Sequence, residues 1–385
     1  MGYSEIIEKY KTPFYIYDID VLNERIKFLR NRINNDVKLC YAMKANPFII
    51  SYLPNLIDRI EVCSPGEYEI CKKNKISEEK LVISGVNKEE KEIKEIITNL
   101  NKEIITIESI NQFELILSLA KHAKKKVKVL IRLTSGNQFG VSESELFMII
   151  KRSLENTFIE VRGLEYFSGT QKHSIKKLTK EFDYLKEIIS SVSKEFNFEI
   201  QELEYGTGFP VFYFEDSNFD EEEFLSAFNI LLTNFKNTHI TLEIGRSIAA
   251  SCGSYWTSVV DMKKNETGNY CILDGGIHQL VYYGSTLAMK IPFYEVTPKR
   301  ENGDKEKWTL CGSLCSVNDV IAKNIEISNL KVGDTLIFKN TGAYSATEGI
   351  ALFLSRDLPK IIIKKKNEIK VLRDRIETYQ FNTGK

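Results

Sequence analysis

The sequence lacks a long hydrophobic run and an excess of either charge. No segment approaches the roughly 18 apolar residues that a membrane-spanning helix needs, and the polar first ten residues contain no apolar core of a signal peptide. The 53 basic and 53 acidic side chains cancel to a net charge of +0. We therefore expect neither a membrane protein nor a nucleic-acid-binding protein.

Cysteine and histidine are also sparse. The seven cysteines are odd in number and scattered, and no Cys-x-x-Cys pair occurs. The four histidines form no cluster with the spacing of zinc ligands. This pattern is typical of reduced thiols, so we expect a cytoplasmic protein with neither a disulfide framework nor a metal site.

The most regular feature of the chain is an alternation of short apolar segments with longer amphipathic segments. The apolar segments predict eight strands, at residues 37–41, 59–62, 81–84, 104–107, 127–133, 161–167, 202–205 and 240–244. Helices are expected between them, at 88–99, 111–124, 142–154, 174–196 and 220–234. Eight such units over about 210 residues are typical of a (β/α)8 TIM barrel. The alternative is an open doubly wound sheet, but no GxGxxG follows the first strand.

The rhythm stops after Gly245 and gives way to a region rich in strands. Strands are predicted at residues 254–263, 270–273, 308–310, 335–338, 360–364 and 368–372. Near the N-terminus, residues 12–18 predict a further strand, and a helix over 20–31 follows with Asp20 as its N-cap. The chain is therefore expected to contain a barrel and a second, β-rich domain.

A lysine stands where the active site of such a barrel is expected, at the C-terminal end of a strand. Lys44 follows the first apolar segment, and Asn46-Pro47 then ends that segment. A lysine at the tip of a buried strand loses water, its pKa tends to fall, and the neutral amine can form a Schiff base. The alternative is an ordinary solvated surface charge.

Two further strand ends carry groups that fit the same chemistry. Gly206-Thr207-Gly208 follows the seventh strand, where backbone amides can bind a phosphate, and Gly245-Arg246 adds an amide and a guanidinium after the eighth. Glu243 ends the eighth strand, where a carboxylate is costly without a partner. That partner is Arg246, a lysine or a protonated ring nitrogen. Together with Lys44, these groups describe a pocket for pyridoxal 5'-phosphate (PLP), whose ring acts as an electron sink.

The ordered set of motifs resembles the fold-type III PLP-dependent decarboxylases, which include diaminopimelate, ornithine and arginine decarboxylases. The similar motifs are Tyr41-Ala42-Met43-Lys44-Ala45-Asn46, Ser64-Pro65-Gly66-Glu67, Phe139-Gly140-Val141, Gly206-Thr207-Gly208, Glu243-Ile244-Gly245-Arg246, residues 312–319 and Gly342-Ala343-Tyr344. The resemblance implies an α/β plus β fold. Residues 25–250 would form a PLP-binding (β/α)8 barrel, and residues 1–24 and 251–385 a β-domain, sandwich or barrel, in which the N-terminal strand joins the C-terminal sheet.

The resemblance also implies roles for single residues. Lys44 would hold PLP, and Cys315 would protonate the carbanion left by loss of carbon dioxide. The other implied cofactor-binding residues are Phe167, Thr170, Gly206, Thr207, Gly208, Glu243 (at the pyridine nitrogen), Ile244, Gly245, Arg246 and Tyr344. The implied substrate contacts are Ser316, Asp319 and Tyr283. An ordinary buried role for Cys315 and a helix-capping role for Asp319 are the alternatives.

Family members are head-to-tail homodimers with shared active sites, so Cys315 and Asp319 are expected to reach the partner subunit's Lys44. Three departures bear on the substrate. Phe167 replaces the histidine that stacks on the PLP ring, Ser316 replaces an acidic residue, and no arginine stands within residues 280–284. These changes argue against diaminopimelate and ornithine as substrates.

The predicted function is therefore the PLP-dependent α-decarboxylation of a modified amino acid or of one presented by a carrier protein. Diaminopimelate decarboxylation, amino-acid racemisation and non-catalytic PLP binding are the alternatives. Racemases of this fold place an arginine at the pyridine nitrogen, where this chain has Glu243.

Overall fold

The computed structural model describes residues 2–99, 102–214, 219–235, 237–285, 288–300 and 304–384. The chain divides into two compact units. One comprises Ile26–Pro210 and Phe219–Ser247, and the other comprises Met1–Arg25, Val211–Asn218 and Ile248–Lys385. The predicted domain limits at residues 24/25 and 250/251 stay a prediction. Within the described ranges, no helix has both the length and the apolar character that a membrane span requires.

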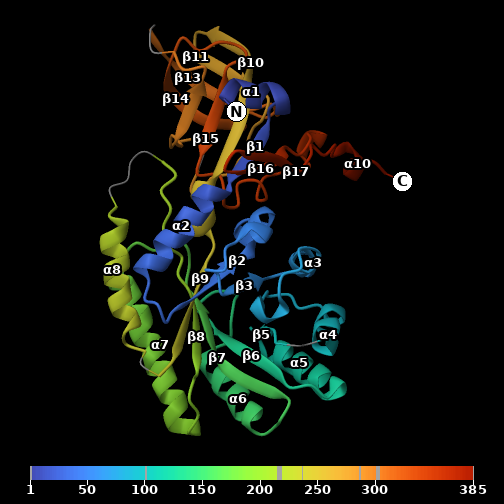
Figure 1. Cartoon of the computed structure of the whole chain (residues 1–385), viewed down its shortest axis with the longest axis vertical. Coiled ribbons are helices and arrows are strands. Elements are labelled where there is room, and N and C mark those ends of the chain that lie inside the picture. The colour runs from blue at the N-terminus through green and yellow to red at the C-terminus, as the bar shows by residue number, and fades with distance from the viewer. Residues whose placement is uncertain are drawn as a thin grey trace. The chain divides into compact units, whose positions relative to one another are not determined.

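Eight parallel strands close into a barrel in the first unit (Figure 1), which confirms the predicted barrel and makes the open sheet wrong. In barrel order they are β2 (Lys38–Ala42), β3 (Arg59–Val62), β4 (Leu81–Ile83), β5 (Ile104–Ile107), β6 (Val127–Leu133), β7 (Ile159–Phe167), β8 (Glu202–Gly206) and β9 (His239–Ile244). The pairing of β2 with β9 closes the cylinder, with Cys40 opposite Glu243. The ends of β2, β3 and β9 therefore lie side by side.

Helices cover the outside of this barrel, and α4 and α5 lie next to each other, as do α7 and α8 (Figure 1). The helices are α2 (Ile19–Arg32), α3 (Pro65–Lys73), α4 (Glu90–Asn99), α5 (Ile110–Ala123), α6 (Glu143–Leu154), α7 (Ile175–Phe196), α8 (Glu221–Leu232) and α9 (Arg246–Ala249), with short 3-10 turns η1 (Met43–Ala45), η2 (Pro47–Tyr52) and η3 (Glu78–Lys80). Their starts follow local chemistry: Ser142 and Glu145 form a capping box, and Asp220 caps α8.

The barrel interior combines an apolar layer with charged groups. The apolar layer consists of Cys40, Val82, Ile104 and Leu130, which are packed together. Arg59 on β3 pairs with Glu202 and lies 3.4 Å from Glu204, both on β8. Because these side chains fill the interior of the barrel, the barrel is a packed core that supports the residues at its mouth.

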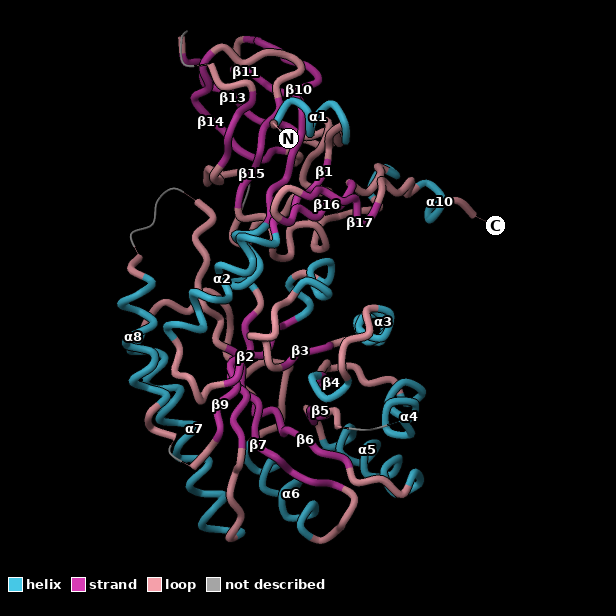
Figure 2. Tube along the Cα trace, in the orientation of Figure 1, coloured by secondary structure: helices cyan, strands magenta, loops and turns pink. Residues whose placement is uncertain are grey.

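The second unit contains a mixed sheet of nine strands (Figure 2). They are β1 (Phe14–Asp18), β10 (Gly253–Asn265), β11 (Gly268–Leu273), β12 (Tyr294–Thr297), β13 (Lys305–Cys311), β14 (Val320–Ser328), β15 (Thr335–Lys339), β16 (Lys360–Lys365) and β17 (Glu368–Arg373). β1 lies between β10 and β16, so the N-terminal strand joins the C-terminal sheet, as predicted. The short helices α1 (Tyr3–Tyr10) and α10 (Tyr379–Asn382) and the turns η4 (Ala250–Cys252) and η5 (Phe353–Ser355) complete the unit.

Two predicted helix caps are wrong. Helix α2 begins at Ile19, and the Asp18 carboxylate accepts the N–H groups of Asp20 at 3.0 Å and Val21 at 3.3 Å, so Asp18 caps the helix. Asp319 precedes strand β14 and not a helix. Its carboxylate accepts backbone N–H groups from two other segments, as described below.

Candidate active site

Lys44 lies at the mouth of the barrel between two carboxylates. Turn η1 carries it just beyond β2, with Met43 and Ala45 buried on either side. Its Nζ is 2.6 Å from Glu61 Oε2 on β3 and 3.1 Å from Glu243 Oε1 on β9. The Lys44 side chain is 41% exposed, so the predicted loss of water is wrong. The amine is instead held in place by acids from the two strands that flank β2.

Glu165 on β7 joins these two acids in a buried cluster. One carboxylate oxygen from each of Glu61, Glu165 and Glu243 lies within 4.8 Å of the others. Burial opposes ionisation of Glu61, but the Lys44 charge and hydrogen bonds with Glu243 and Lys44 lower its pKa to about 2. Burial, followed by the charge of Glu61, raises the pKa of Glu243 to about 7. Glu61 is therefore ionised, while Glu243 can gain or lose a proton near neutral pH.

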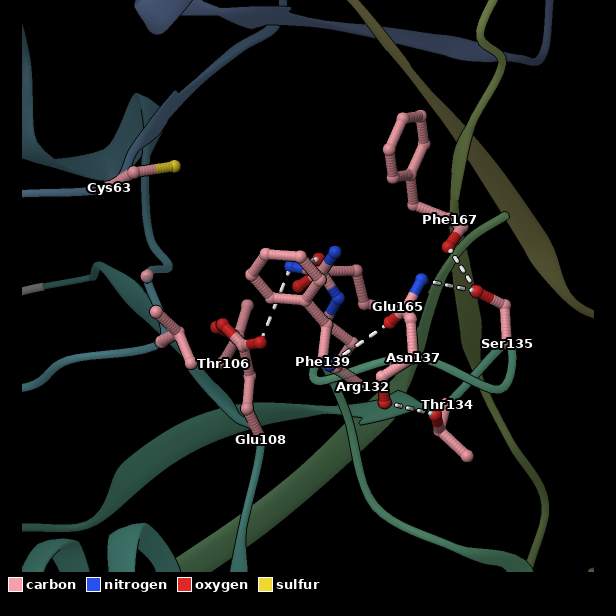
Figure 3. A network of polar contacts seen from close by, with 12 residues as sticks. Cys63, Thr106, Glu108, Arg132, Thr134, Ser135, Asn137, Phe139, Glu165 and Phe167 are labelled. Atoms are coloured by element: carbon pink, nitrogen blue, oxygen red, sulfur yellow. Dashed lines mark hydrogen bonds and ion pairs between the residues drawn. The ribbon is translucent and has the colours of Figure 1, made fainter. Parts of the chain in front are cut away.

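Arg132 on β6 lies beside Glu165 and Glu108 (Figure 3). Its Nη1 is 3.3 Å from Glu165 and 3.5 Å from Glu108, and its guanidinium carbon lies 4.9 Å from the centre of the Phe139 ring. Burial raises the pKa of Glu165 to about 8, against the opposing charge of Arg132. Among the described residues, neither carboxylate oxygen of Glu108 or Glu165 has a hydrogen-bond partner. Both acids therefore lie within ion-pair distance of the same guanidinium, and the Lys88 ammonium adds a further positive charge near them.

The loop after β6 explains why Phe139 reaches this arginine. Val141 N–H donates to the Arg132 carbonyl at 2.9 Å, which folds the loop back onto the strand end. Ser135 Oγ donates to the Phe167 carbonyl at 3.0 Å and ties the loop to β7, as Figure 3 shows. The predicted Phe139-Gly140-Val141 motif therefore positions a cation at the mouth.

The glycine loop after β8 lies against the ends of β7 and β9. A Cβ at Gly206 would lie 2.4 Å from the Phe167 ring, and one at Gly208, where φ is +56°, would lie 2.1 Å from the Gly169 carbonyl. On the other side, Thr207 N–H donates to the Glu243 carbonyl at 3.1 Å. Only glycine permits this close approach of three backbone segments.

Arg246 Nε donates to Thr170 Oγ1 at 3.2 Å, which links the segment after β9 to the loop after β7. The structure thus brings together all the predicted barrel residues: Lys44, Phe167, Thr170, Gly206, Thr207, Gly208, Glu243, Ile244, Gly245 and Arg246. They fit PLP on chemical grounds. An amine is present for the aldehyde, a carboxyl with a pKa near 7 for the ring nitrogen, and a cradle of glycines and a guanidinium for the phosphate.

The other predicted site residues belong to the second unit. Cys315 is exposed in the loop between β13 and β14, and Ser316 beside it is half-buried. Tyr283 is exposed, and Tyr344 is half-buried with a φ of +65°. Their predicted contacts with the cofactor and substrate stay predictions.

Asp319 is buried at the base of the loop that carries Cys315. Its carboxylate accepts the N–H groups of Ile277 at 2.9 Å and Leu314 at 2.7 Å. A Cβ at Gly276 or Gly312 would lie within 2.6 Å of that carboxylate. Asp319 therefore fixes the shape of the loop.

Sequence reasoning missed Glu61, Arg132 and Glu165, although the sequence contains a signal for them. Each is a charged residue with an apolar or aromatic neighbour on either side, although its strand (Arg59–Val62, Val127–Leu133 or Ile159–Phe167) contains at least one further charge. Burying such a charge is costly unless a partner is present. Three of them on strands of one barrel therefore indicate a polar site inside it.

Comparison with known proteins agrees with this geometry. A family model described as pyridoxal-dependent decarboxylase, C-terminal sheet domain, matches residues 14–342. The chain belongs to the pyridoxal-dependent decarboxylases. The predicted PLP cofactor and carboxy-lyase class are thereby confirmed, and racemisation and non-catalytic binding are set aside.

Individual relatives span nearly the whole chain. L-glutamyl-[BtrI acyl-carrier protein] decarboxylase of Niallia circulans is 25% identical over 399 residues, which cover 96% of this chain and 92% of that protein. A diaminopimelate decarboxylase of Helicobacter pylori strain J99 is 26% identical over 402 residues, covering 97% and 95%. The crystal structure of a diaminopimelate decarboxylase from H. pylori complexed with L-lysine superposes with a TM-score of 0.88 at 23% identity, over 98% of each chain. The shared fold thus extends through both units.

Proposed function

We propose that this enzyme removes the α-carboxylate of a modified or carrier-tethered amino acid, in a pocket built around Lys44. The observation that carries the proposal is the position of the Lys44 amine at the barrel mouth, between Glu61 and Glu243. The glycine loop 206–208 is bonded to the same strand end as Glu243. PLP, when bound, supplies an electron sink for the electrons released on loss of carbon dioxide.

The two carboxylates at Lys44 have different tasks. An amine must lose its proton before it can act as a nucleophile. Glu61 Oε2 at 2.6 Å and Glu243 Oε1 at 3.1 Å are both in reach of Nζ. Glu61, with a pKa of about 2, is a poor base and serves to orient the amine. Glu243, with a pKa of about 7, is matched to accept a proton near neutral pH.

The remaining residues of the barrel hold the cofactor. Gly206, Thr207 and Gly208 form the phosphate cradle with Arg246, and Thr170 orients the Arg246 guanidinium through their 3.2 Å hydrogen bond. Phe167, whose ring contacts the glycine loop, covers an apolar surface of the pocket but cannot donate a hydrogen bond. Glu243 is the residue that would pair with a protonated ring nitrogen of the bound cofactor.

Cys315 is proposed as the proton donor to the substrate carbon, from the second subunit of a homodimer with shared active sites. Its thiol is free and exposed, and the buried Asp319 fixes the loop that presents it. An exposed thiol on a rigid loop is suited to act outside its own subunit. The same free thiols support the proposed cytoplasmic location.

The substrate proposal rests on two charged residues that diaminopimelate decarboxylases have and that this chain lacks at the corresponding positions. Ser316 has no charge with which to bind the distal amino group of a substrate, and residues 280–284 contain no arginine to bind a distal carboxylate. A tethered substrate needs neither, because its distal end is occupied by the carrier. The relative from Niallia circulans, named for a glutamyl group on an acyl-carrier protein, supports this reading. Diaminopimelate is the second candidate, supported by the H. pylori relative.

Carbon dioxide release by the PLP-loaded enzyme tests the proposal. The panel contains free meso-diaminopimelate, L-ornithine and L-glutamate, and L-glutamate as a thioester on an acyl-carrier protein. We expect kcat/KM for the thioester to exceed that for free glutamate by about 100-fold or more. Faster turnover of free diaminopimelate would overturn the carrier proposal and leave the second candidate.

Two controls assign the residues. Lys44→Ala should abolish release and prevent labelling of the protein by borohydride, whereas Lys72→Ala, at an exposed ion pair on α3, should change neither. An equal mixture of Lys44→Ala and Cys315→Ala subunits should recover about a quarter of the parent activity, because half of the dimers hold one intact site of two. No recovery would refute shared active sites.

A further inference from the structure

Lys172, on the loop between β7 and α7, is a buried lysine beside the glycine loop. Its side chain is only 12% exposed. The ammonium lies 2.8 Å from Tyr205 Oη, 3.1 Å from Ser168 Oγ, 3.1 Å from Glu181 Oε2 and 3.1 Å from the Gly206 carbonyl. Such a complete set of partners is unusual for a lysine, because most lysines keep the ammonium in water.

Lys172 holds both ends of the glycine loop. Its side chain donates to the Gly206 carbonyl, and its backbone N–H donates to the Gly208 carbonyl at 2.8 Å. The contact is tight, since a Cβ at Gly208 would lie 3.0 Å from Lys172 Cε. Thr207 in the middle is held from the opposite side by the Glu243 carbonyl. One residue therefore brackets the loop from the β7 side.

Glu181 on α7 supplies the counter-charge. Its Oε1 accepts the Ser168 hydroxyl at 2.7 Å, and its Oε2 accepts the Tyr205 hydroxyl at 2.6 Å in addition to the Lys172 ammonium. Burial lowers the pKa of Lys172, and the charge and hydrogen bond of Glu181 oppose that shift. The four side chains form a closed polar network behind the glycine loop.

We propose that Lys172, with Glu181 as its counter-ion, is a positioning residue that holds residues 206–208 in the conformation that binds the PLP phosphate. This inference rests on the proposed function, because it assigns the phosphate to that loop. Lys172 itself does not touch the reacting atoms. Its ammonium is fully used by protein oxygens, so its effect on the phosphate acts through the backbone that it fixes.

The proposal predicts a selective loss of phosphate recognition. Without the ammonium, the Gly206 carbonyl loses a charge-assisted hydrogen bond, an effect of about tenfold in an equilibrium constant when the bond is buried. Lys44 and Glu243 contact each other from other strands, so we expect their contact to be kept in the variant. The affinity for PLP should therefore fall, while the affinity for pyridoxal, which has the same aldehyde and ring but no phosphate, should stay the same.

The experiment measures equilibrium binding of PLP and of pyridoxal to the cofactor-free full-length protein by absorbance titration. For Lys172→Met we expect a PLP dissociation constant at least about tenfold higher and a pyridoxal constant within about twofold of the parent. Glu181→Gln should also raise the ratio of the PLP dissociation constant to the pyridoxal dissociation constant. It provides a second test if Lys172→Met fails to fold. Lys177→Met, at an exposed position on α7, the helix that carries Glu181, is the control and should leave both dissociation constants unchanged.

The outcomes separate the two proposals. A parent protein that binds neither ligand, or binds both equally, contradicts the proposed PLP site itself. A parent that prefers PLP, with variants that keep that preference, overturns the role of Lys172. Equal weakening of both ligands also overturns it, because this would show a general loss of structure.

Discussion

Replacing Glu165 by glutamine should stabilise the cofactor-free protein, and by more as the pH rises. Glu165 is 1% exposed, and its raised pKa of about 8 means that it is mainly protonated in the folded state at neutral pH. In the unfolded chain the same group ionises near its ordinary value of 4.5. The unfolded state therefore releases a proton that the folded state keeps, and stability falls as the pH rises between these values.

The size of this effect follows from the two pKa values. Each unit of difference corresponds to about 1.36 kcal/mol, so at pH 7 the glutamate lowers the free energy of unfolding by about 3 kcal/mol relative to a side chain that does not titrate. Glutamine has a similar volume and no charge. The lost ion pair with Arg132 costs little, because the acid that it contacts is protonated over most of this range. We expect Glu165→Gln to match the parent near pH 4.5 and to exceed it by about 2–3 kcal/mol at pH 7.

Urea unfolding followed by circular dichroism at pH 5, 6, 7 and 8 would measure this difference. Glu187→Gln, at an exposed position on α7, is the matched control and should differ from the parent by less than about 0.5 kcal/mol at every pH. The reasoning is refuted if the difference between Glu165→Gln and the parent is the same at pH 5 and pH 8, or if the parent is the more stable protein at pH 8.

Three further predictions concern the other parts of the site. The pKa of Glu61 is lowered from 4.5 to about 2, so Glu61 stabilises the fold above pH 4.5, and this stabilisation is lost as the pH falls toward 2. In acid unfolding, the free energy of unfolding of Glu61→Gln should therefore fall by roughly 2 kcal/mol less than that of the parent. The pKa difference alone would give a larger value, but the partner amine is partly solvated. Gly208→Ala should lower PLP affinity at least about tenfold and lower the free energy of unfolding by roughly 2 kcal/mol or more, because the new Cβ would overlap a backbone carbonyl. Gly136 also has a positive φ but has open space around it, so Gly136→Ala should lower the free energy of unfolding by only about 1 kcal/mol. Titration should show that Gly136→Ala leaves PLP binding unchanged. Asp319→Ala should lower the free energy of unfolding by about 2–4 kcal/mol, because two backbone N–H groups lose their acceptor. Asp261→Ala, at an exposed position of β10, is the control and should have little effect. Equal effects of the two substitutions in thermal unfolding would contradict the role of Asp319.

The barrel was predictable because its strands are largely buried and rich in apolar residues, and they alternate with amphipathic segments. β3, β5 and β6 occur at the predicted residues, since Arg59–Val62, Ile104–Ile107 and Val127–Leu133 are bounded by polar segments on both sides. The helices followed from three- and four-residue spacing, and their starts agree where Ser142 or Asp220 supplies a cap.

The missed elements have local causes. Helix α3 starts with Pro65-Gly66, a pair that also reads as a turn, and the cap that decides between the two is the Ser64 hydroxyl, which accepts Glu67 N–H. Strand β14 contains Lys323 and Asn324 within its apolar pattern, and Asn324 has a φ of +56° beside a shift of register. Such irregularity is stabilised by the pairing with β13, which lies outside the local sequence.

The acid cluster was missed for a different reason, because its members are distant in sequence. The hydrogen bonds from Lys44 to Glu61 and to Glu243 join residues that are 17 and 199 positions apart. No local pattern reports that Glu61 and Glu243 flank the same amine. The sequence shows only that these strands contain charged residues, and the closure of the barrel decides which of them meet.

The charges at the barrel mouth explain why an acidic cluster can serve a cofactor that itself carries a negative phosphate. Among the described residues, Glu61, Glu165 and Glu243 are paired directly with the Lys44 ammonium and the Arg132 guanidinium, and the Lys88 ammonium adds positive charge near Glu165. Three acids so close together repel one another when ionised, which agrees with the raised pKa values of Glu165 and Glu243. If the Lys44 amine gives up its positive charge to react with an aldehyde, a protonated ring nitrogen at Glu243 restores the balance. The phosphate requires a separate location, and the loop 206–208 with Arg246 is the one that we propose for it. The acidic character of the mouth therefore favours a ligand that is cationic at one end and anionic at the other, as PLP is.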